Sequence, residues 1–136
     1  MADYTIAATL DQPYDAAVEA VRAALGEQGF GILTEIDLKA TLKAKLDVDV
    51  APQVILGACR PALAYEALTT EPSIAAVLPC NVVVRALDES TSVVEAFNPD
   101  TMMGMADDPG LQVVAADAKQ RIVAALASLQ AVEEGH

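Results

Sequence analysis

The sequence contains no tryptophan, and aromatic side chains make up only 4% of its 136 residues. Apolar residues nevertheless account for 54% of the chain, so the predicted core is aliphatic, with valine, leucine, isoleucine and alanine as its main components. The strongly apolar runs are about six to ten residues long, whereas a helix needs roughly 20 such residues to cross a bilayer. The sequence therefore predicts no membrane-spanning segment.

Histidine occurs once, as the last residue, His136. Ser-His-Asp triads, Cys-His dyads and histidine metal sites therefore lack their central component. The chain also lacks a GxxxxGK[ST] loop, and Gly26, Gly29 and Gly31 do not have the spacing of the GxGxxG fingerprint. These absences exclude histidine-dependent catalysis and the two best-known nucleotide-binding loops.

Basic residues are also few, because eight lysines and arginines stand against 20 aspartates and glutamates, which gives a formal charge of −12. The one basic cluster, Lys39, Lys43 and Lys45, has no aromatic residues between its members. Since this charge repels polyanions, we expect no nucleic-acid partner. No basic segment followed by an apolar run begins the chain, so no secretory signal is recognised, and we expect a soluble cytoplasmic protein.

The length fits a single domain over residues 1–136. Apolar residues recur every three or four positions in the predicted helices, which cover residues 12–28, 38–46 and 111–129, and shorter helical segments are expected after Pro61 and over 74–78. β-Branched and apolar runs predict strands over residues 4–10, 30–36, 54–58, 81–87 and 91–97. Residues 98–110 show no period and are expected to form a loop. The residues after Ala131 are expected to fray. This mixed order predicts an α+β fold.

Two cysteines, Cys59 and Cys80, are the most conspicuous candidates for chemistry. Cys59 is predicted at a junction between strand and helix, where the helix dipole and the adjacent Arg60 favour a thiolate. The 21-residue separation of the two cysteines fits neither a CxxC motif nor a zinc knuckle. Three interpretations stay open: two inert buried thiols, a pair for thiol redox or sulfur transfer, and a soft-metal site.

Methionines could extend a soft-metal site, because thioethers and thiolates both suit Cu(I). The candidates are Met102, Met103 and Met105, for which adaptable packing is the alternative. Glu35 and Asp37 form a separate candidate pair, since two residues spaced by one point to the same face of a strand. Such a pair suits acid-base chemistry or a hard cation. Alternatively, Asp37 caps the next helix and Glu35 is a solvated charge.

The chain resembles the DUF302 family, also called TT1751-like, in four blocks that occur in the family's order. The blocks are residues 31–37, the lysine-rich segment 39–46, residues 55–61 and residues 78–84. The resemblance implies a β-α-β(4)-α domain similar to the TBP-like fold, with helices packed on an antiparallel sheet and short helices inserted between strands. It also implies a homodimer, and it implies no activity because the function of the family is unknown.

The resemblance places the family's recurring residues at a limited set of positions: Glu35, Asp37, Gly57, Cys59, Pro61, Pro79, Cys80 and Asn81. The chain departs from the family at Arg60, where many relatives carry asparagine, and near Tyr65, where many carry histidine. The leading interpretation is a small acidic homodimer that binds a small molecule, a soft metal or a partner near Cys59 and Cys80. A thiol redox or sulfur-transfer protein and a structural domain with inert cysteines are the alternatives.

Overall fold

The structure is a computed structural model that describes residues 3–103 and 108–134. Its five strands are β1 (Thr5–Leu10), β2 (Gly31–Asp37), β3 (Gln53–Cys59), β4 (Cys80–Ala86) and β5 (Ser92–Phe97). Its helices are α1 (Tyr14–Glu27), α2 (Leu38–Leu46), α3 (Pro61–Thr70), the 3-10 helix η1 (Pro72–Val77), α4 (Asp100–Met103) and α5 (Pro109–Glu134). The α+β prediction and the β-α-β(4)-α order with inserted helices are confirmed.

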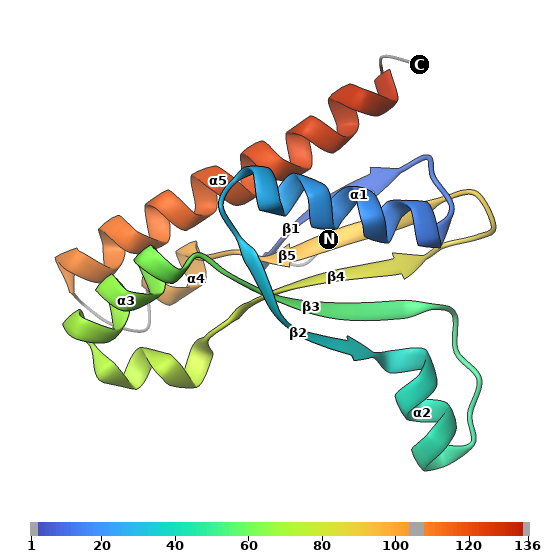
Figure 1. Ribbon diagram of the computed structural model, residues 1–136, viewed down its shortest axis with the longest axis horizontal. Helices are drawn as coiled ribbons and strands as arrows, with labels where there is room; N and C mark the ends of the chain where they lie inside the picture. The colour runs from blue at the N-terminus through green and yellow to red at the C-terminus, as the bar shows by residue number, and fades with distance from the viewer. Residues whose placement is uncertain (1–2, 104–107, 135–136) are drawn as a thin grey trace.

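All neighbouring strands are antiparallel, and the sheet has the order β1-β5-β4-β3-β2. Figure 1 shows α1 and α5 side by side on the near face of the sheet, with α3 at one end and α2 projecting from the other. None of the helices in the described ranges has the length and apolar character needed to span a membrane.

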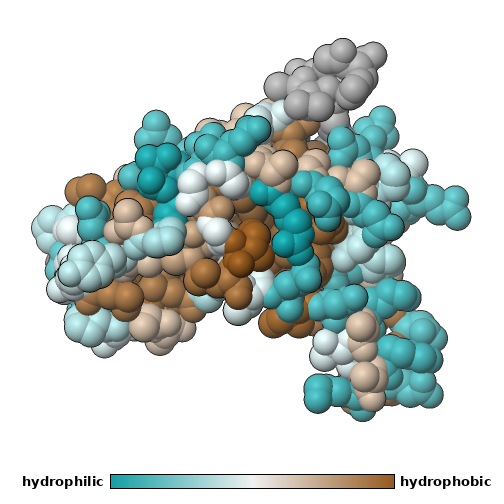
Figure 2. Space-filling view, viewed as in Figure 1, coloured by the Kyte–Doolittle hydropathy of each residue, from teal (hydrophilic) through white to brown (hydrophobic). Residues whose placement is uncertain are grey.

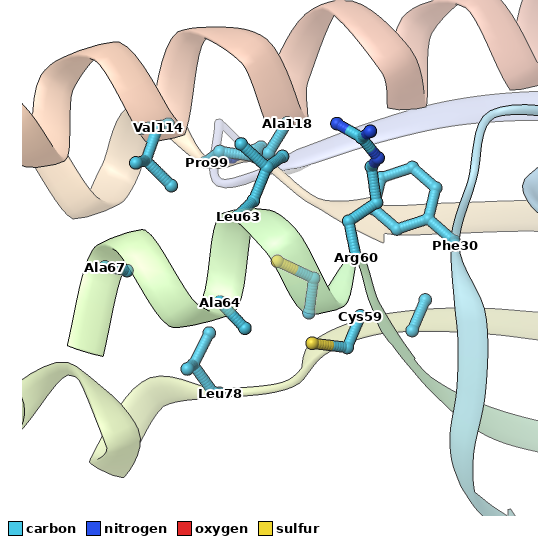
Figure 3. A pocket seen from close by; sticks show the side chains of 13 residues that line it. Phe30, Cys59, Arg60, Leu63, Ala64, Ala67, Leu78, Pro99, Val114 and Ala118 are labelled. Atoms are coloured by element: carbon cyan, nitrogen blue, oxygen red, sulfur yellow. The ribbon is translucent and has the colours of Figure 1, made fainter. Parts of the chain in front are cut away.

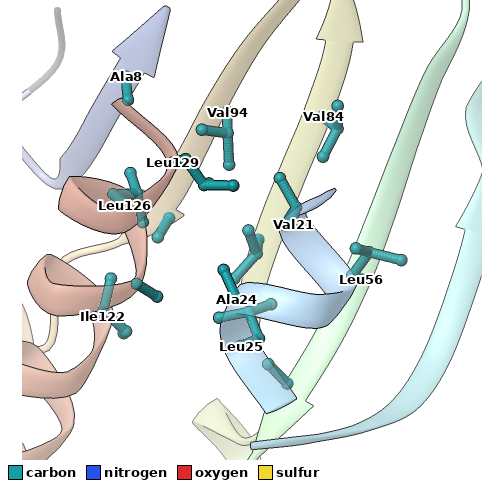
Figure 4. Close-up of a cluster of buried hydrophobic side chains, with 14 of the residues drawn as sticks. Ala8, Val21, Ala24, Leu25, Leu56, Val84, Val94, Ile122, Leu126 and Leu129 are labelled. Carbon is teal, nitrogen blue, oxygen red and sulfur yellow. The ribbon is translucent and has the colours of Figure 1, made fainter. Parts of the chain in front are cut away.

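The core lies between this near face and the two long helices (Figure 4). Residues directly opposite each other in a sheet share a face, and one such row, Ala8, Val94, Val84 and Val54, is buried throughout. The helices contribute Ala17, Val21, Ala24 and Leu25 from α1 and Ile122, Ala125, Leu126 and Leu129 from α5. Each fully buried valine or leucine contributes about 1.5–3 kcal/mol, so this layer holds the sheet and helices together.

The opposite face of the sheet, here called the open face, carries the neighbouring row of residues. That row is Ala7, Glu95, Val83, Ile55 and Ile36, which the strand register places side by side. Its members stay partly exposed, because the two long helices pack on the other face. Near its centre the Glu95 carboxylate forms an ion pair with Arg85 and accepts a hydrogen bond of 2.9 Å from the Thr5 hydroxyl.

The Glu95 interactions predict a pH-dependent contribution to stability. The hydrogen bond from Arg85, followed by that from Thr5, lowers the pKa of Glu95 below its ordinary value. Stability from such a lowered carboxyl pKa is present above the ordinary value and is lost as the pH falls through the lowered one. Glu95→Gln should therefore lower the free energy of unfolding by about 1 kcal/mol at neutral pH, after solvent screening is allowed for.

Urea denaturation of the wild type and of Glu95→Gln, repeated from neutral pH to about pH 2, measures this difference, which should shrink towards zero at the acid end. Glu89→Gln, at an exposed position in the turn after β4, is the matched control and should change stability little at any pH. A loss from Glu95→Gln that is independent of pH would contradict this role for the carboxylate.

Three local predictions need correction. The helix α2 was expected to bury an apolar face, but none of its residues is buried and Leu46 is 66% exposed. It projects beyond the sheet, so its leucines do not reach the core. The helix predicted from residue 12 begins at Tyr14, with Pro13 as its N-cap and without a capping side-chain hydrogen bond. The segment expected to be helical over 74–78 forms η1, which begins at Pro72.

The predicted loop over residues 98–110 is partly helical. It contains α4 and the start of α5, while residues 104–107 lie outside the described part of the chain. Helix α5 begins at Pro109, a favourable residue for a first helical position, and the Asp108 carboxylate accepts a 2.7 Å hydrogen bond from the Gly110 N–H. The helix continues to Glu134, into the segment expected to fray.

Candidate functional site

The two cysteines lie at the same end of the sheet, on neighbouring strands. Cys59 is the last residue of β3 and Cys80 the first residue of β4. The register pairs Cys80 with Ala58, so Cys59 directly follows the residue opposite Cys80. Both thiols are free and half-buried. Antiparallel pairing therefore brings together two residues that are far apart in sequence.

Both cysteines line one cavity of about 40 Å³ at this end of the sheet (Figure 3). Its walls are mainly aliphatic: Phe30, Ala58, Leu63, Ala64, Ala67, Leu78, Pro99, Val114, Ala115 and Ala118 complete the lining together with Arg60. The volume accommodates about three water-sized spheres. A drug-sized ligand needs roughly 300 Å³ or more, so this cavity fits only an ion or a ligand of very few atoms.

Alanines make this cavity narrow, because they let α3 and α5 approach closely. Ala64 and Ala67 lie three apart on α3, and Ala115 and Ala118 lie three apart on α5. Residues at that spacing share a helix face. Packing of α3 against α5 also buries a second apolar cluster around Ala67. The helix pair thus forms one wall of the cavity at the end of the sheet.

Gly57 keeps the strands close together beside the cavity. A Cβ atom at this position would lie 2.7 Å from Cγ of Pro79 and would overlap the side chain of Thr34. Gly57 pairs with Thr34 on β2 and with Asn81 on β4. The glycine therefore lets both neighbouring segments pack against β3 just before Cys59.

Burial controls the protonation of the two thiols. It raises the pKa of Cys59 above its ordinary value. It also raises the pKa of Cys80, with a further increase from the negative charge that Cys59 would carry. Both cysteines are therefore neutral thiols at neutral pH.

The expected thiolate at Cys59 is wrong for this structure. Cys59 precedes the helix by two positions, since Arg60 is the N-cap and Pro61 the first residue of α3. Desolvation by the mainly aliphatic walls instead raises the pKa of Cys59. The Arg60 side chain also turns towards α5, where its Nη1 atom lies 3.7 Å from Oδ2 of Asp117.

Asp117 connects Arg60 to a second guanidinium. The Nε atom of Arg121 donates a 2.7 Å hydrogen bond to Oδ1 of Asp117, and its Nη1 donates one of 3.5 Å to the Gln28 carbonyl oxygen. Two guanidinium groups therefore share one carboxylate at the edge of the cavity. The local formal charge is +1, which favours a bound group with one negative charge.

The methionine prediction is only partly covered by the described residues. Met102 and Met103 end α4, which packs against α5 shortly after the cavity residue Pro99. Their side chains, and all of Met105, lie outside the described part of the chain. The backbone thus brings α4 near the cavity, and a methionine ligand stays a prediction.

Glu35 and Asp37 lie together, away from the thiols. They share the helix-covered face of the sheet, since their partners Leu56 and Val54 are buried core residues. Glu35 forms an ion pair with Arg22, and Asp37 accepts a 2.9 Å hydrogen bond from the Ala40 N–H as the cap of α2. The capping prediction for Asp37 is therefore confirmed.

A separate open cavity of about 310 Å³ adjoins these carboxylates. Tyr14, Asp15, Val18, Glu19 and Val54 line it together with them. Burial raises the pKa of the Tyr14 phenol, and Asp37 and then Asp15 raise it further. Within the described residues no group of three or more histidine, cysteine, aspartate or glutamate side chains is arranged to hold a metal. The hard-cation hypothesis therefore gains no support here.

Asn81 does not join the thiol cavity. It is exposed on the open face, where the register places it opposite Gly57. Apart from the methionines, six site residues were predicted from the sequence. The structure brings Cys59, Cys80 and Arg60 together. It places Glu35, Asp37 and Asn81 away from them.

The cavity walls were not predicted as site residues. Alanine and leucine give no chemical signal, and Phe30 and Pro99 come from distant parts of the chain. One signal is present, namely the three-residue spacing of alanines in two separate helices. Figure 2 shows that the surface over α3 and the adjoining end of the sheet is largely apolar, whereas α2 is mostly hydrophilic.

Fold and site together define a two-layer α+β domain with a thiol-lined apolar cavity at one end of its sheet. Residues 6–129 match the domain of unknown function DUF302, so the chain belongs to this family. It is also similar to the crystal structure of the uncharacterized conserved protein DUF302 from Bacillus stearothermophilus, at 28% identity and a TM-score of 0.82. That match covers 92% of this chain and 97% of the other. No curated protein matches the chain.

Proposed function

We propose that the protein binds a soft metal ion, with Cu(I) as the best-fitting candidate, between Cys59 and Cys80. The observation that carries this proposal is the shared cavity, in which the two thiols lie among mainly aliphatic walls and are the only sulfur groups that the described residues contribute. Thiolates are preferred ligands of Cu(I), and the cavity has room for an ion but not for an organic cofactor. Among the described residues that line the cavity there is no histidine or carboxylate to compete for a harder metal.

Charge balance supports the same ligand. Two thiolates and one Cu(I) ion carry a net charge of −1, which is costly to bury without compensation. Arg60 lines the cavity, and the group of Arg60, Asp117 and Arg121 has a formal charge of +1. The complex and this group are therefore neutral together.

Thiol redox or sulfur transfer is the second candidate and fits less well. Those reactions start from a thiolate, whereas burial raises the pKa of both cysteines. A metal displaces the thiol protons as it binds, so raised pKa values slow exchange chemistry but still permit a metal-thiolate site. The two roles differ in what would protect the thiols from alkylation. A bound metal would protect them in the first role, and a disulfide in the second.

Alkylation of the native protein, followed by mass spectrometry, tests the metal site. Both thiols should react more slowly than a free cysteine, and Cu(I) added without oxygen should slow labelling of both at least tenfold further, on the order expected for ligated thiolates. In Cys80→Ser, Cys59 should lose most of this protection, and Cys59→Ser should have the reciprocal effect.

Asn81→Ala is the matched control for this experiment, because Asn81 adjoins Cys80 in sequence but lies on the open face. Its labelling and its protection by Cu(I) should equal those of the wild type. Labelling of wild-type Cys59 that Cu(I) does not change would contradict the proposal. So would protection that survives in Cys80→Ser.

We also propose that the protein is a homodimer of the cytoplasm. The two free cysteines support a reducing compartment. The partly exposed apolar residues of the open face support a second subunit. Neither proposal depends on the metal site.

A further inference from the structure

The open face has a composition unlike the rest of the chain. Three rows of paired residues run across it. The first row is the one described above, Ala7, Glu95, Val83, Ile55 and Ile36. The second row is Thr9, Val93, Arg85 and Gln53, and the third is Asn81, Gly57 and Thr34. In these rows only Arg85 and Glu95 carry charge, and they form an ion pair. The open face is therefore formally neutral in a chain with a charge of −12.

This neutrality favours a second copy of the chain as the partner. Two copies that each carry −12 repel one another, and the repulsion is least when neutral surfaces meet. A basic partner would instead be attracted to the acidic surfaces elsewhere. Val83, Ile55 and Ile36 give the open face an apolar strip across three strands, with Ile36 44% exposed.

The sheet edges are less suitable for self-association. The β2 edge has a register irregularity between Ile32 and Thr34, and it ends at a charged residue, Asp37. Bulges and charged residues protect edge strands from pairing with another chain. The β1 edge is short, because the strand has six residues, and Asp3 and Asp11 lie on either side of it. A face-to-face contact avoids both edges.

The open face is also large enough for a reversible dimer. Five strands spaced by about 4.8 Å, each about six residues long at 3.3 Å per residue, span about 500 Å² of plane area. Two copies together bury at most about 1,000 Å², near the lower bound for a specific interface, because Val93 is already only 1% exposed in the single chain.

We propose that the open face is the surface through which two copies of this chain associate, packed sheet against sheet about a two-fold axis. In such a contact the Val83 and Ile55 strip of one copy meets the same strip of the other. Glu95 lies in the same row as this strip and Arg85 in the neighbouring row, so that each copy offers one charge of each sign across the contact. This inference rests on the proposed homodimer and is independent of the thiol cavity.

Analytical ultracentrifugation over a range of protein concentrations tests the surface. The wild type should dimerise, and Val83→Glu, which places an unpaired carboxylate in the contact, should weaken dimerisation at least 100-fold. Val113→Glu on α5 is the matched control, because Val113 is 68% exposed and lies outside the open face. It should dimerise like the wild type. Thermal unfolding checks that each variant is folded, and the milder Val83→Asn should weaken the dimer about tenfold in the same folded state.

The outcomes separate the two proposals. A wild type that stays monomeric at hundreds of micromolar would overturn both the homodimer and its surface. A dimer that is unaffected by Val83→Glu and Val83→Asn, or that Val113→Glu disrupts instead, would overturn the surface alone. Protection of Cys59 by Cu(I) should be the same in the wild type and in all three variants.

Discussion

Replacing Gly57 with alanine is expected to cost about 3 kcal/mol of the free energy of unfolding. The added Cβ would lie 2.7 Å from Cγ of Pro79 and would overlap Thr34. Neither neighbour yields easily, because the proline ring is rigid and a β-branched threonine has few side-chain conformations. The strands must therefore separate beside Cys59. Chemical denaturation monitored by circular dichroism measures the loss.

Gly26→Ala is the control with the opposite expected sign. Gly26 is an exposed position in α1, and nothing lies within 4 Å of a Cβ atom built there. Alanine should stabilise this helix by about 0.5–1 kcal/mol, since glycine loses more chain entropy on folding. If Gly57→Ala were as stable as the wild type while Gly26→Ala behaved as expected, close packing at Gly57 would not be the reason for its glycine.

Cu(I) binding should strengthen by up to 100-fold for each unit of increase in pH. Burial raises the pKa of both cysteines, so both are protonated near neutral pH. A metal held by two thiolates displaces two protons, and each contributes up to tenfold per pH unit below its pKa. The dependence should flatten as the pH rises through the raised pKa values. Competition with a coloured Cu(I) chelator over a pH series measures it.

The single variants provide the comparison for this pH series. Cys59→Ser and Cys80→Ser each leave one thiol, so any residual binding should change by at most tenfold per pH unit. Wild-type binding that does not depend on pH would contradict ligation by two protonated thiols. If wild-type binding strengthened only tenfold per pH unit, a single proton would be displaced, and the metal would be assigned to a single cysteine.

Most of the fold was predictable from the sequence, because local signals and tertiary structure agree. The periodicity around Val21 and Leu25 predicted α1 to within two residues at its start, and those residues are buried as expected. The β-branched runs 81–87 and 91–97 predicted β4 and β5, which pair with each other. The apolar and β-branched runs predicted five strands, and the order of the elements predicted an α+β fold.

The structural predictions were wrong where apolar periodicity suggested a contact that does not form, or where there was no apolar periodicity. Leu38, Leu42 and Leu46 have helical spacing, but no element of the described chain lies against them closely enough to bury them. Around Asp108 there is no apolar period, and the start of α5 depends on a capping carboxylate and a proline. Apolar spacing predicts which residues share a face, but not whether anything covers that face.

The site was predictable in its residues but not in its protonation. Cysteines are rare enough in this chain to be noticed, and antiparallel pairing of β3 with β4 brought them to one cavity. Their raised pKa values depend on walls formed by α3, α5 and Pro99, which are remote in sequence. The sequence therefore suggested a thiolate beside Arg60, whereas the assembled cavity favours two neutral thiols.

X-ray absorption at the copper edge of the Cu(I)-loaded protein is the most direct test of the thiol cavity as a metal site. The account predicts one copper per chain with two sulfur ligands and no nitrogen or oxygen ligand, and loss of that signal when Cys59 and Cys80 are both replaced by serine. Copper held by nitrogen or oxygen, or a sulfur signal that persists in the double variant, would contradict it.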